Sequence, residues 1–416
     1  MSKTHMGMIV ILFGVLVFKG AVVSFLVPIA SAPLEVYHYR MADRHRVAGQ
    51  LPGGSTGVIS KELSHVIRYF QRDGDRIGQR TQHDRRKLTA DLNKSGTRAL
   101  VTTSSYLPSI DQSPGYYLLL RSILDSLRGM EIRWRWFILR IFHLLSMTLA
   151  CMIIVHVAFR MGVTDRSAAL WAGFVFVSGP GFGLDGSLLG PHSVLVFLWA
   201  FFIWRLVAFL RSSAVVDAAM AALTAFVMSS IHIHGFFAFI VAAIVLSIGI
   251  ARARGRSRIF LILPLIFVIS GITSWVLRDI SQQGVIAEEY RNTNTAVMQI
   301  FSRSTWNTAP ADILSYVWGC MTLMGLAGIF ILVRRNQIKQ PAVFIPILSV
   351  FVAGLFGIAF PDIFMAWGSL SPLFALIMGA GFSVLSIRYR VVWIVLIIMV
   401  CIDLLDLIYQ VVRMYS

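Results

Sequence analysis

Long apolar runs dominate the sequence, and short polar connections separate most of them. A membrane-crossing helix needs about 20 consecutive apolar residues, and about eleven runs here approach or reach that length. The first run covers residues 6–30, and the others lie near 137–159, 168–189, 192–210, 214–231, 234–251, 259–277, 313–333, 341–360, 363–383 and 391–411. The runs are continuous rather than alternating, which favours helices over the strands of a membrane barrel. The pattern therefore predicts an all-α polytopic membrane protein with about 11 transmembrane helices.

Two polar stretches divide this series of runs. The predicted parts are a first transmembrane helix at 1–30, an outer loop with interfacial helices at 31–136, transmembrane helices 2–7 at 137–277, a second outer loop at 278–312, and transmembrane helices 8–11 at 313–416. A multi-pass integral membrane protein with a large outer loop after its first helix is the resulting expectation.

The first polar stretch has apolar pieces of its own. Apolar residues recur at helical spacing in its middle, at Ile59, Leu63, Val66 and Phe70. This spacing predicts an amphipathic helix that lies on the membrane or on the bundle. A later piece, residues 116–127, follows Ser113-Pro114-Gly115 and is too short to span a bilayer. We expect it to lie at the membrane interface.

Composition supports the membrane class. The chain is 57% hydrophobic and 14% charged, whereas soluble proteins carry about a quarter of charged residues. The formal net charge is +17, which in a membrane protein indicates basic cytoplasmic loops and membrane lipids as partners. No soluble basic module is evident, so nucleic acid is not an expected partner. The three cysteines lie in apolar runs and show no metal-binding or disulfide spacing.

The basic connections alternate along the chain and orient it. Arginine and lysine gather after every second run, at Arg160, Arg166, Arg211, Arg252, Arg254, Arg256, Arg258, Arg334, Arg335, Lys339, Arg388 and Arg390. The short connections near 190, 232 and 362 carry neither residue type. The positive-inside rule therefore places the N-terminus in the cytoplasm and 31–136, 278–312 and the C-terminus outside.

Lys19, Asp403 and Asp406 are charged residues inside predicted membrane helices. Lys19 is costly in a bilayer unless it reaches the interface or finds a partner. Asp403 and Asp406 share a face of the last run and are candidates to pair with Lys19 or with a membrane protein partner. Ala30-Ser31-Ala32 is similar to a signal-peptidase site, but the length of the first run favours an uncleaved helix.

Glu35 and His38 are the strongest candidates for chemistry. They follow the first run directly, and at a spacing of three they share a face of a helical turn. A carboxylate at the bilayer edge can accept a proton from a hydroxyl, and the imidazole can orient it or bind a phosphate. The alternative is an interfacial helix cap beside the aromatic belt of Tyr37 and Tyr39.

Histidines raise the question of a metal. His232 and His234 sit between two runs, and with an outer carboxylate they could bind a divalent metal. A polar turn between two helices explains the same residues. No cofactor is otherwise indicated.

Some of these motifs resemble a known class. The pattern Pro33-x-Glu35-x-x-His38 is similar to a Pro-Asp-Glu-x-x-His pattern in bacterial GT-C-like families, and Ser113-Pro114-Gly115-Tyr116-Tyr117 resembles their Ser-Pro-x-x-Tyr segment. Together with the large loop after helix one, this resembles the GT-C class of membrane glycosyltransferases. One departure is Leu34, which stands where the family pattern has Asp.

The resemblance implies a function and a site. The expected activity is transfer of a sugar from a polyprenyl-phosphate-linked donor to an acceptor at the outer face of the bacterial inner membrane. Glu35 and His38 are the expected catalytic residues. The expected substrate- and phosphate-binding residues are Arg40, Asp43, Asp111, Arg278, Arg291, Arg303 and Trp306. Arginine suits the phosphate because its donor fork matches phosphate oxygens.

Two alternatives remain open. One is a non-catalytic GT-C-like subunit of a membrane complex, which Leu34 favours. The other is a secondary transporter or flippase. No Walker loop, HExxH motif, CxxC pair or dinucleotide fingerprint occurs in the sequence, which argues against an ATP-driven pump.

Overall fold

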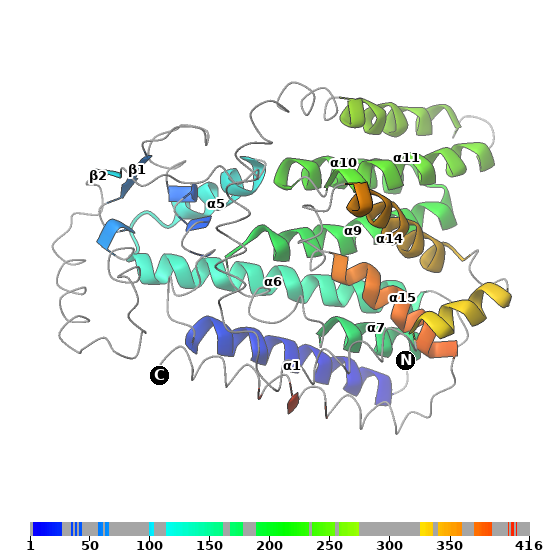
Figure 1. The fold of residues 1–416 in the computed structure, drawn as a ribbon, viewed down its shortest axis with the longest axis horizontal. Helices are drawn as coiled ribbons and strands as arrows, with labels where there is room; N and C mark the ends of the chain where they lie inside the picture. The colour runs from blue at the N-terminus through cyan, green and yellow to red at the C-terminus, as the bar shows by residue number, and fades with distance from the viewer. Residues whose placement is uncertain are drawn as a thin grey trace.

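The structure of the protein is a computed structural model (Figure 1). It describes residues 3–26, 35, 38–39, 41–43, 57–60, 63–65, 100–103, 114–160, 167–177, 189–232, 235–253, 258–273, 325–335, 340–359, 370–384, 398, 401–402 and 405. The elements in these ranges are helical apart from one small sheet. They are α1 (Lys3–Leu26), β1 (Gly57–Ser60), β2 (Leu100–Thr103), α5 (Pro114–Ser126), α6 (Ile132–Phe159), α7 (Ser167–Val177), α9 (Pro191–Ser212), α10 (Val215–Ile231), α11 (Gly235–Arg252), α14 (Pro341–Ala359) and α15 (Ser371–Val384). Two shorter apolar helices, Arg258–Thr273 and Gly325–Arg334, add to these.

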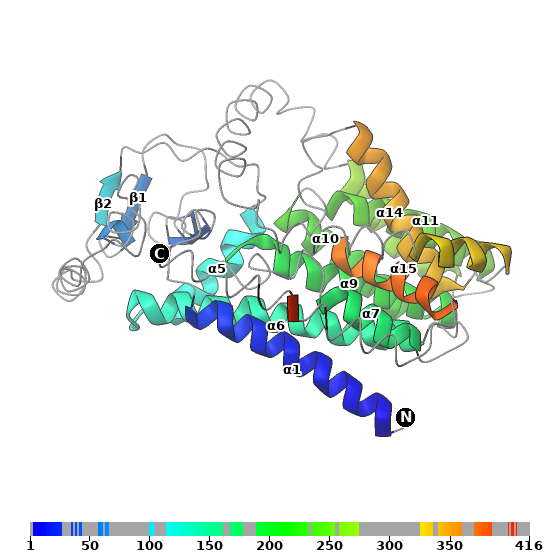
Figure 2. The same ribbon diagram turned by 60° about the horizontal axis from the view of Figure 1, so that its bottom comes forward.

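The helices form a bundle in which neighbours in sequence are often neighbours in space. α9 packs against α6 and α10, α10 packs against α11, and α15 packs against α7. α1 lies along α6 and α7, as both views show (Figures 1 and 2). α1 and α6 run in opposite directions, because Gly20 of α1 meets Leu144 of α6 while Ser24 meets the earlier Arg140.

Three helices are long and apolar enough to cross a membrane by length and composition: α6, α9 and α11. The outer face of α6 explains how such a helix meets lipid. Leu145 and Met152 are each 55% exposed, and Leu149 lies between them on the same face. A stripe of large exposed apolar side chains marks a membrane-facing surface. The helices therefore indicate a membrane protein, and the predicted number of about 11 spans extends beyond the described ranges.

The predicted amphipathic helix through Ile59, Leu63, Val66 and Phe70 was wrong at its start. Residues 57–60 form β1, which pairs antiparallel with β2 in the register Gly57↔Thr103 to Ser60↔Leu100. Residues 63–65 are helical, and Val66 and Phe70 lie outside the described ranges. Val58 and Ile59 are β-branched, and so are Val101, Thr102 and Thr103 on the partner strand. β-branched side chains are stiff at χ1 and favour strands, so local preference and pairing outweigh the helical spacing here.

Lys19 finds a partner inside the bundle. Its side chain is buried, and Nζ donates a hydrogen bond to the carbonyl oxygen of Val177, the last residue of α7, at 3.2 Å. A cation is favourable at a helix C-terminus, where carbonyl groups point outward. The lysine therefore ties α1 to α7, whereas Asp403 and Asp406 lie outside the described ranges.

Glycine permits the closest helix contacts. A Cβ atom on Gly379 of α15 would lie 2.7 Å from Ala172 Cβ and 2.8 Å from the carbonyl oxygen of Ala168, both on α7. On the other side of α15, a Cβ on Gly328 would meet the Gly381 carbonyl oxygen. Small residues let helix backbones approach closely, as is common in membrane proteins. α15 is thus held between α7 and the helix Gly325–Arg334.

We expect Gly379→Ala to destabilise the protein by about 1–3 kcal/mol, because the added methyl group pushes α15 away from α7. Gly14→Ala is the matched control, since a Cβ there meets nothing within 4 Å. Thermal unfolding in detergent should show a lower midpoint for Gly379→Ala and an unchanged or higher one for Gly14→Ala. Equal midpoints would contradict the tight α7–α15 contact.

Candidate functional site

The candidate site lies at one end of the bundle. α1 ends there, α6 and α9 begin there, and the short helix α5 lies beside the start of α6 (Figures 1 and 2). Glu35, His38 and Asp43 are all buried there. The ring of Tyr39 stacks on Trp136 of α6 with centroids 4.3 Å apart. The described residues between 35 and 43, at the start of the first polar stretch, are therefore part of the core.

Glu35 forms a buried ion pair with Arg140 of α6. The guanidinium donates from Nε to Oε1 and from Nη2 to Oε2, both at 2.7 Å. The Glu35 side chain is 0% exposed and that of Arg140 is 1% exposed. Such a two-pronged arginine–carboxylate contact is both strong and directional. It fixes the plane and position of the carboxylate relative to α6.

Two further hydrogen bonds link this ion pair to other segments. Arg140 Nη1 donates to the carbonyl oxygen of Ser24 in α1 at 3.2 Å. The backbone N–H of Leu189, just before α9, donates to Glu35 Oε1 at 3.3 Å. The pair therefore connects α1, α6 and the start of α9 at a single point.

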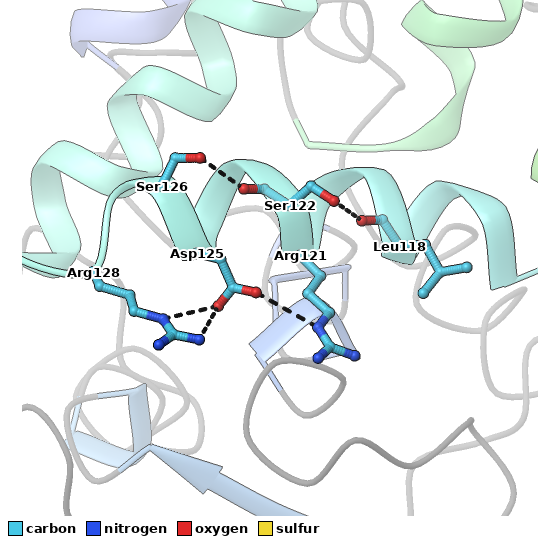
Figure 3. A network of polar contacts seen from close by, with 6 residues as sticks. All are labelled: Leu118, Arg121, Ser122, Asp125, Ser126 and Arg128. Atoms are coloured by element: carbon cyan, nitrogen blue, oxygen red, sulfur yellow. Dashed lines mark hydrogen bonds and ion pairs between the residues drawn. The ribbon is translucent and has the colours of Figure 1, made fainter.

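α5 supplies two tyrosines from its buried face. Tyr116, Tyr117, Leu120 and Leu124 are fully buried. The opposite face is polar, with Asp125 between Arg121 at 3.6 Å and Arg128 at 3.0 Å (Figure 3). α5 is therefore a short helix with one buried and one polar face, and its place at the membrane interface stays a prediction.

The hydrogen bonds of His143 fix its tautomer. Nδ1 lies 2.6 Å from the Leu139 carbonyl oxygen, which can only accept, so Nδ1 carries the proton. Nε2 of the neutral ring then accepts from the Tyr116 hydroxyl at 2.9 Å. Burial, and next the nearby negative charge of Glu35, raise the pKa of Tyr116 well above its usual value. Tyr116 therefore stays protonated as a hydrogen-bond donor.

His38 is a neutral residue in this site. Its Nδ1 lies 3.2 Å from the Tyr117 hydroxyl. Burial, followed by the positive charges that His192 and His143 could carry, lowers the pKa of His38 from 6.5 to about 3. At neutral pH the ring can accept or donate a hydrogen bond, but it does not supply a positive charge to a phosphate.

The described ranges hold no group of three or more His, Cys, Asp or Glu residues arranged to bind a metal ion. Of the pair suggested as a metal site, His232 follows α10 and His234 lies outside the described ranges. Two histidines meet near Gly190, where a Cβ atom would lie 3.7 Å from His38 Nε2 and 4.0 Å from His192 Cδ2.

The structure places three of the predicted site residues in one buried segment: Glu35, His38 and Asp43. The other candidates, Arg40, Asp111, Arg278, Arg291, Arg303 and Trp306, lie outside the described ranges, so their roles remain predictions.

Sequence reasoning missed Arg140 and His143, the partners of Glu35 and Tyr116. Both lie within a long apolar run, where an ionisable side chain usually faces the bundle interior and has a function or a partner. That signal was present in the sequence. The sequence did not show which residues they would pair with, because 105 residues separate Glu35 from Arg140.

Comparisons with known proteins give remote structural neighbours. No protein-family model matches the sequence, and no curated protein matches it. The chain is similar to the Archaeoglobus fulgidus oligosaccharyltransferase in complex with Zn and sulfate, with a TM-score of 0.46, 14% identity, and 98% of this chain and 52% of that chain covered. It is also similar to AglB, the archaeal oligosaccharyltransferase of Archaeoglobus fulgidus, in complex with an inhibitory peptide and a dolichol-phosphate, with a TM-score of 0.45, 13% identity, and 99% and 55% covered. The chain spans about half the length of these neighbours, and a likeness at this level assigns no activity to it.

The low pKa of His38 predicts a pH-dependent stability. Between pH 6.5 and about 3 the unfolded chain binds a proton at this residue and the folded protein does not. Stability is therefore fully present above pH 6.5 and falls as the pH is lowered, by up to about 1.4 kcal/mol per pH unit. His38→Gln keeps a neutral polar side chain, so its melting temperature in detergent should decline less between pH 7 and 4.5. Parallel declines in the two proteins would contradict a neutral buried His38.

Proposed function

We propose that this protein is a membrane glycosyltransferase that moves a sugar from a polyprenyl-phosphate-linked donor to an acceptor at the outer membrane face. The observation that carries the proposal is the Glu35 carboxylate, held by Arg140 where α1, α6 and α9 meet at one end of a membrane-type helix bundle. The sequence resemblance to the GT-C class expects a carboxylate at this place, directly after the first helix.

Glu35 acts in this proposal as the general base. A carboxylate offers about four lone-pair positions, and Arg140 and Leu189 occupy three of them among the described residues. The remaining position can accept the proton of an acceptor hydroxyl once a substrate displaces part of the cover over this fully buried carboxylate. A base that is already fixed in orientation needs little rearrangement when the hydroxyl attacks the anomeric carbon.

The remaining roles follow from charge. Because His38 is neutral, we assign it the orientation of the reacting groups through Tyr117, and not the binding of the phosphate. The leaving phosphate then needs arginines, for which Arg278, Arg291 and Arg303 are the candidates, and Trp306 is the candidate for stacking on a sugar face. Arg40, Asp43 and Asp111 complete the proposed substrate-binding set.

A second function has its own support. Glu35 is fully buried and both of its oxygens contact Arg140. These properties also suit a structural ion pair, in which case the protein is a non-catalytic subunit that retains the helical frame. The two functions differ in whether the charge of Glu35 is needed for more than folding.

A double-mutant cycle separates the two. Glu35→Gln leaves Arg140 buried without its counter-charge, which costs about 3–5 kcal/mol of stability. Glu35→Gln combined with Arg140→Gln removes both charges and should recover part of that loss. If Glu35 is the base, sugar transfer falls by about 10²–10⁴ in the single and the double variant alike. The measurements are thermal unfolding in detergent and transfer in membranes supplied with a set of polyprenyl-linked sugars.

The ion pair Arg205–Asp217, joined at 3.1 Å, serves as the control for this cycle. Replacing both of its members by Gln and Asn should leave sugar transfer unchanged. Recovery of transfer together with stability in the Glu35–Arg140 double variant would show that the pair is only structural. Absence of transfer by the unaltered protein with every donor would favour the non-catalytic subunit.

A further inference from the structure

α6 and α9 end side by side at the opposite end of the bundle from Glu35, and each end carries an arginine. The Arg211 guanidinium, in the last turn of α9, donates from Nη2 to the carbonyl oxygen of Arg160, the C-cap residue of α6. Both arginine side chains are exposed. A cation is favourable at a helix C-terminus, and here that preference brings a second arginine next to the first.

Among the described residues, the positive charge of this pair has no carboxylate partner. Asp217 of α10 accepts instead from Arg205 at 3.1 Å and from the Ser212 hydroxyl at 3.4 Å. Arg205 in turn lies over the Trp204 ring at 4.1 Å. Within the described ranges no carboxylate pairs with Arg160 or Arg211. Two guanidinium groups in this position repel each other and present several outward donors, which suits an anion with several oxygens.

The surface that leads to the pair is apolar except for His156, which is exposed and lies edge-on against Trp204. Met152 is 55% exposed and Phe159 is 43% exposed on the outer face of α6, which continues to Arg160. These residues extend the stripe of Leu145 and Leu149. A ligand on this face would meet apolar side chains along the helix and two arginines at its end.

We propose that Arg160 and Arg211 bind the phosphate headgroup of an anionic membrane lipid, whose acyl chains lie along Met152 and Phe159. A lipid fits better than a free phosphate because the arginines stand at the end of an exposed apolar stripe on a membrane-length helix. The charge alternation in the sequence predicts that this end of the bundle lies at the cytoplasmic side of the membrane. The cytoplasmic leaflet carries the anionic lipids that attract basic side chains. This site is separate from the proposed glycosyltransferase site and does not depend on it.

The test compares lipid binding by the purified full-length protein and two double variants. Phosphatidylglycerol is titrated into detergent-solubilised protein while the melting temperature is followed, and retained lipids are counted by native mass spectrometry. Arg160→Gln with Arg211→Gln should bind phosphatidylglycerol about 10- to 30-fold more weakly. Arg128→Gln with Arg133→Gln is the matched control, since it removes the same charge from exposed arginines that pair with Asp125 and Glu131 at the other end.

The outcomes are distinct. Binding that is lost in the first variant and kept in the control supports the site, as does the absence of a shift with phosphatidylcholine. Equal loss in both variants would show a general charge effect and overturn the proposal. A shift of the same size with inorganic phosphate alone would overturn the assignment to a lipid.

Discussion

The ion pair between Glu35 and Arg140 holds together segments that are far apart in the sequence. Removing two charges from water is expensive, and their attraction repays that cost only with good geometry and additional hydrogen bonds. Here the guanidinium and carboxylate meet in a two-pronged contact, Ser24 accepts a further hydrogen bond, and Leu189 donates one. Removing any one of these groups would leave a buried charge or polar atom without a hydrogen-bond partner. The network therefore fixes α1, α6 and the start of α9 relative to one another.

The surroundings of the ion pair keep water away from it. The Tyr39 ring covers Trp136, and α5 turns Tyr116 and Tyr117 towards the same region. Inside such a low-dielectric site, hydrogen bonds are stronger and charges act over longer distances. The effect of Glu35 on the hydroxyl of Tyr116 is one example.

The sequence predicts the helices of this protein better than their contacts. α9, α10 and α11 occupy apolar runs near 192–210, 214–231 and 234–251, because a continuous run of apolar residues leaves little choice but a buried or lipid-facing helix. α6 begins at Ile132, earlier than its run suggests, since Arg133 and Arg135 look like loop residues when only hydropathy is considered. The pairing of β1 with β2 joins residues about forty positions apart, and no local pattern specifies it. The candidate site shows the same division: Glu35 and His38 stand out by residue type and position, whereas the pairing of Arg140 with Glu35 and of His143 with Tyr116 is visible only in the folded chain.

The glycines of α15 have a consequence for the thermodynamics of assembly. Inside a bilayer, apolar burial does not drive helices together, because lipid tails are as apolar as leucine. A contact made by Gly379 on one side and Gly381 on the other freezes no side-chain rotamers, so α15 joins its neighbours at a small cost in conformational entropy. The attraction that remains is dispersion, which falls steeply with distance. It acts between closely spaced backbones and between side chains such as Trp171 and Phe382, whose ring centroids lie 4.7 Å apart. α15 is therefore held by closeness of fit, while the end that carries Glu35 contains a buried ion pair.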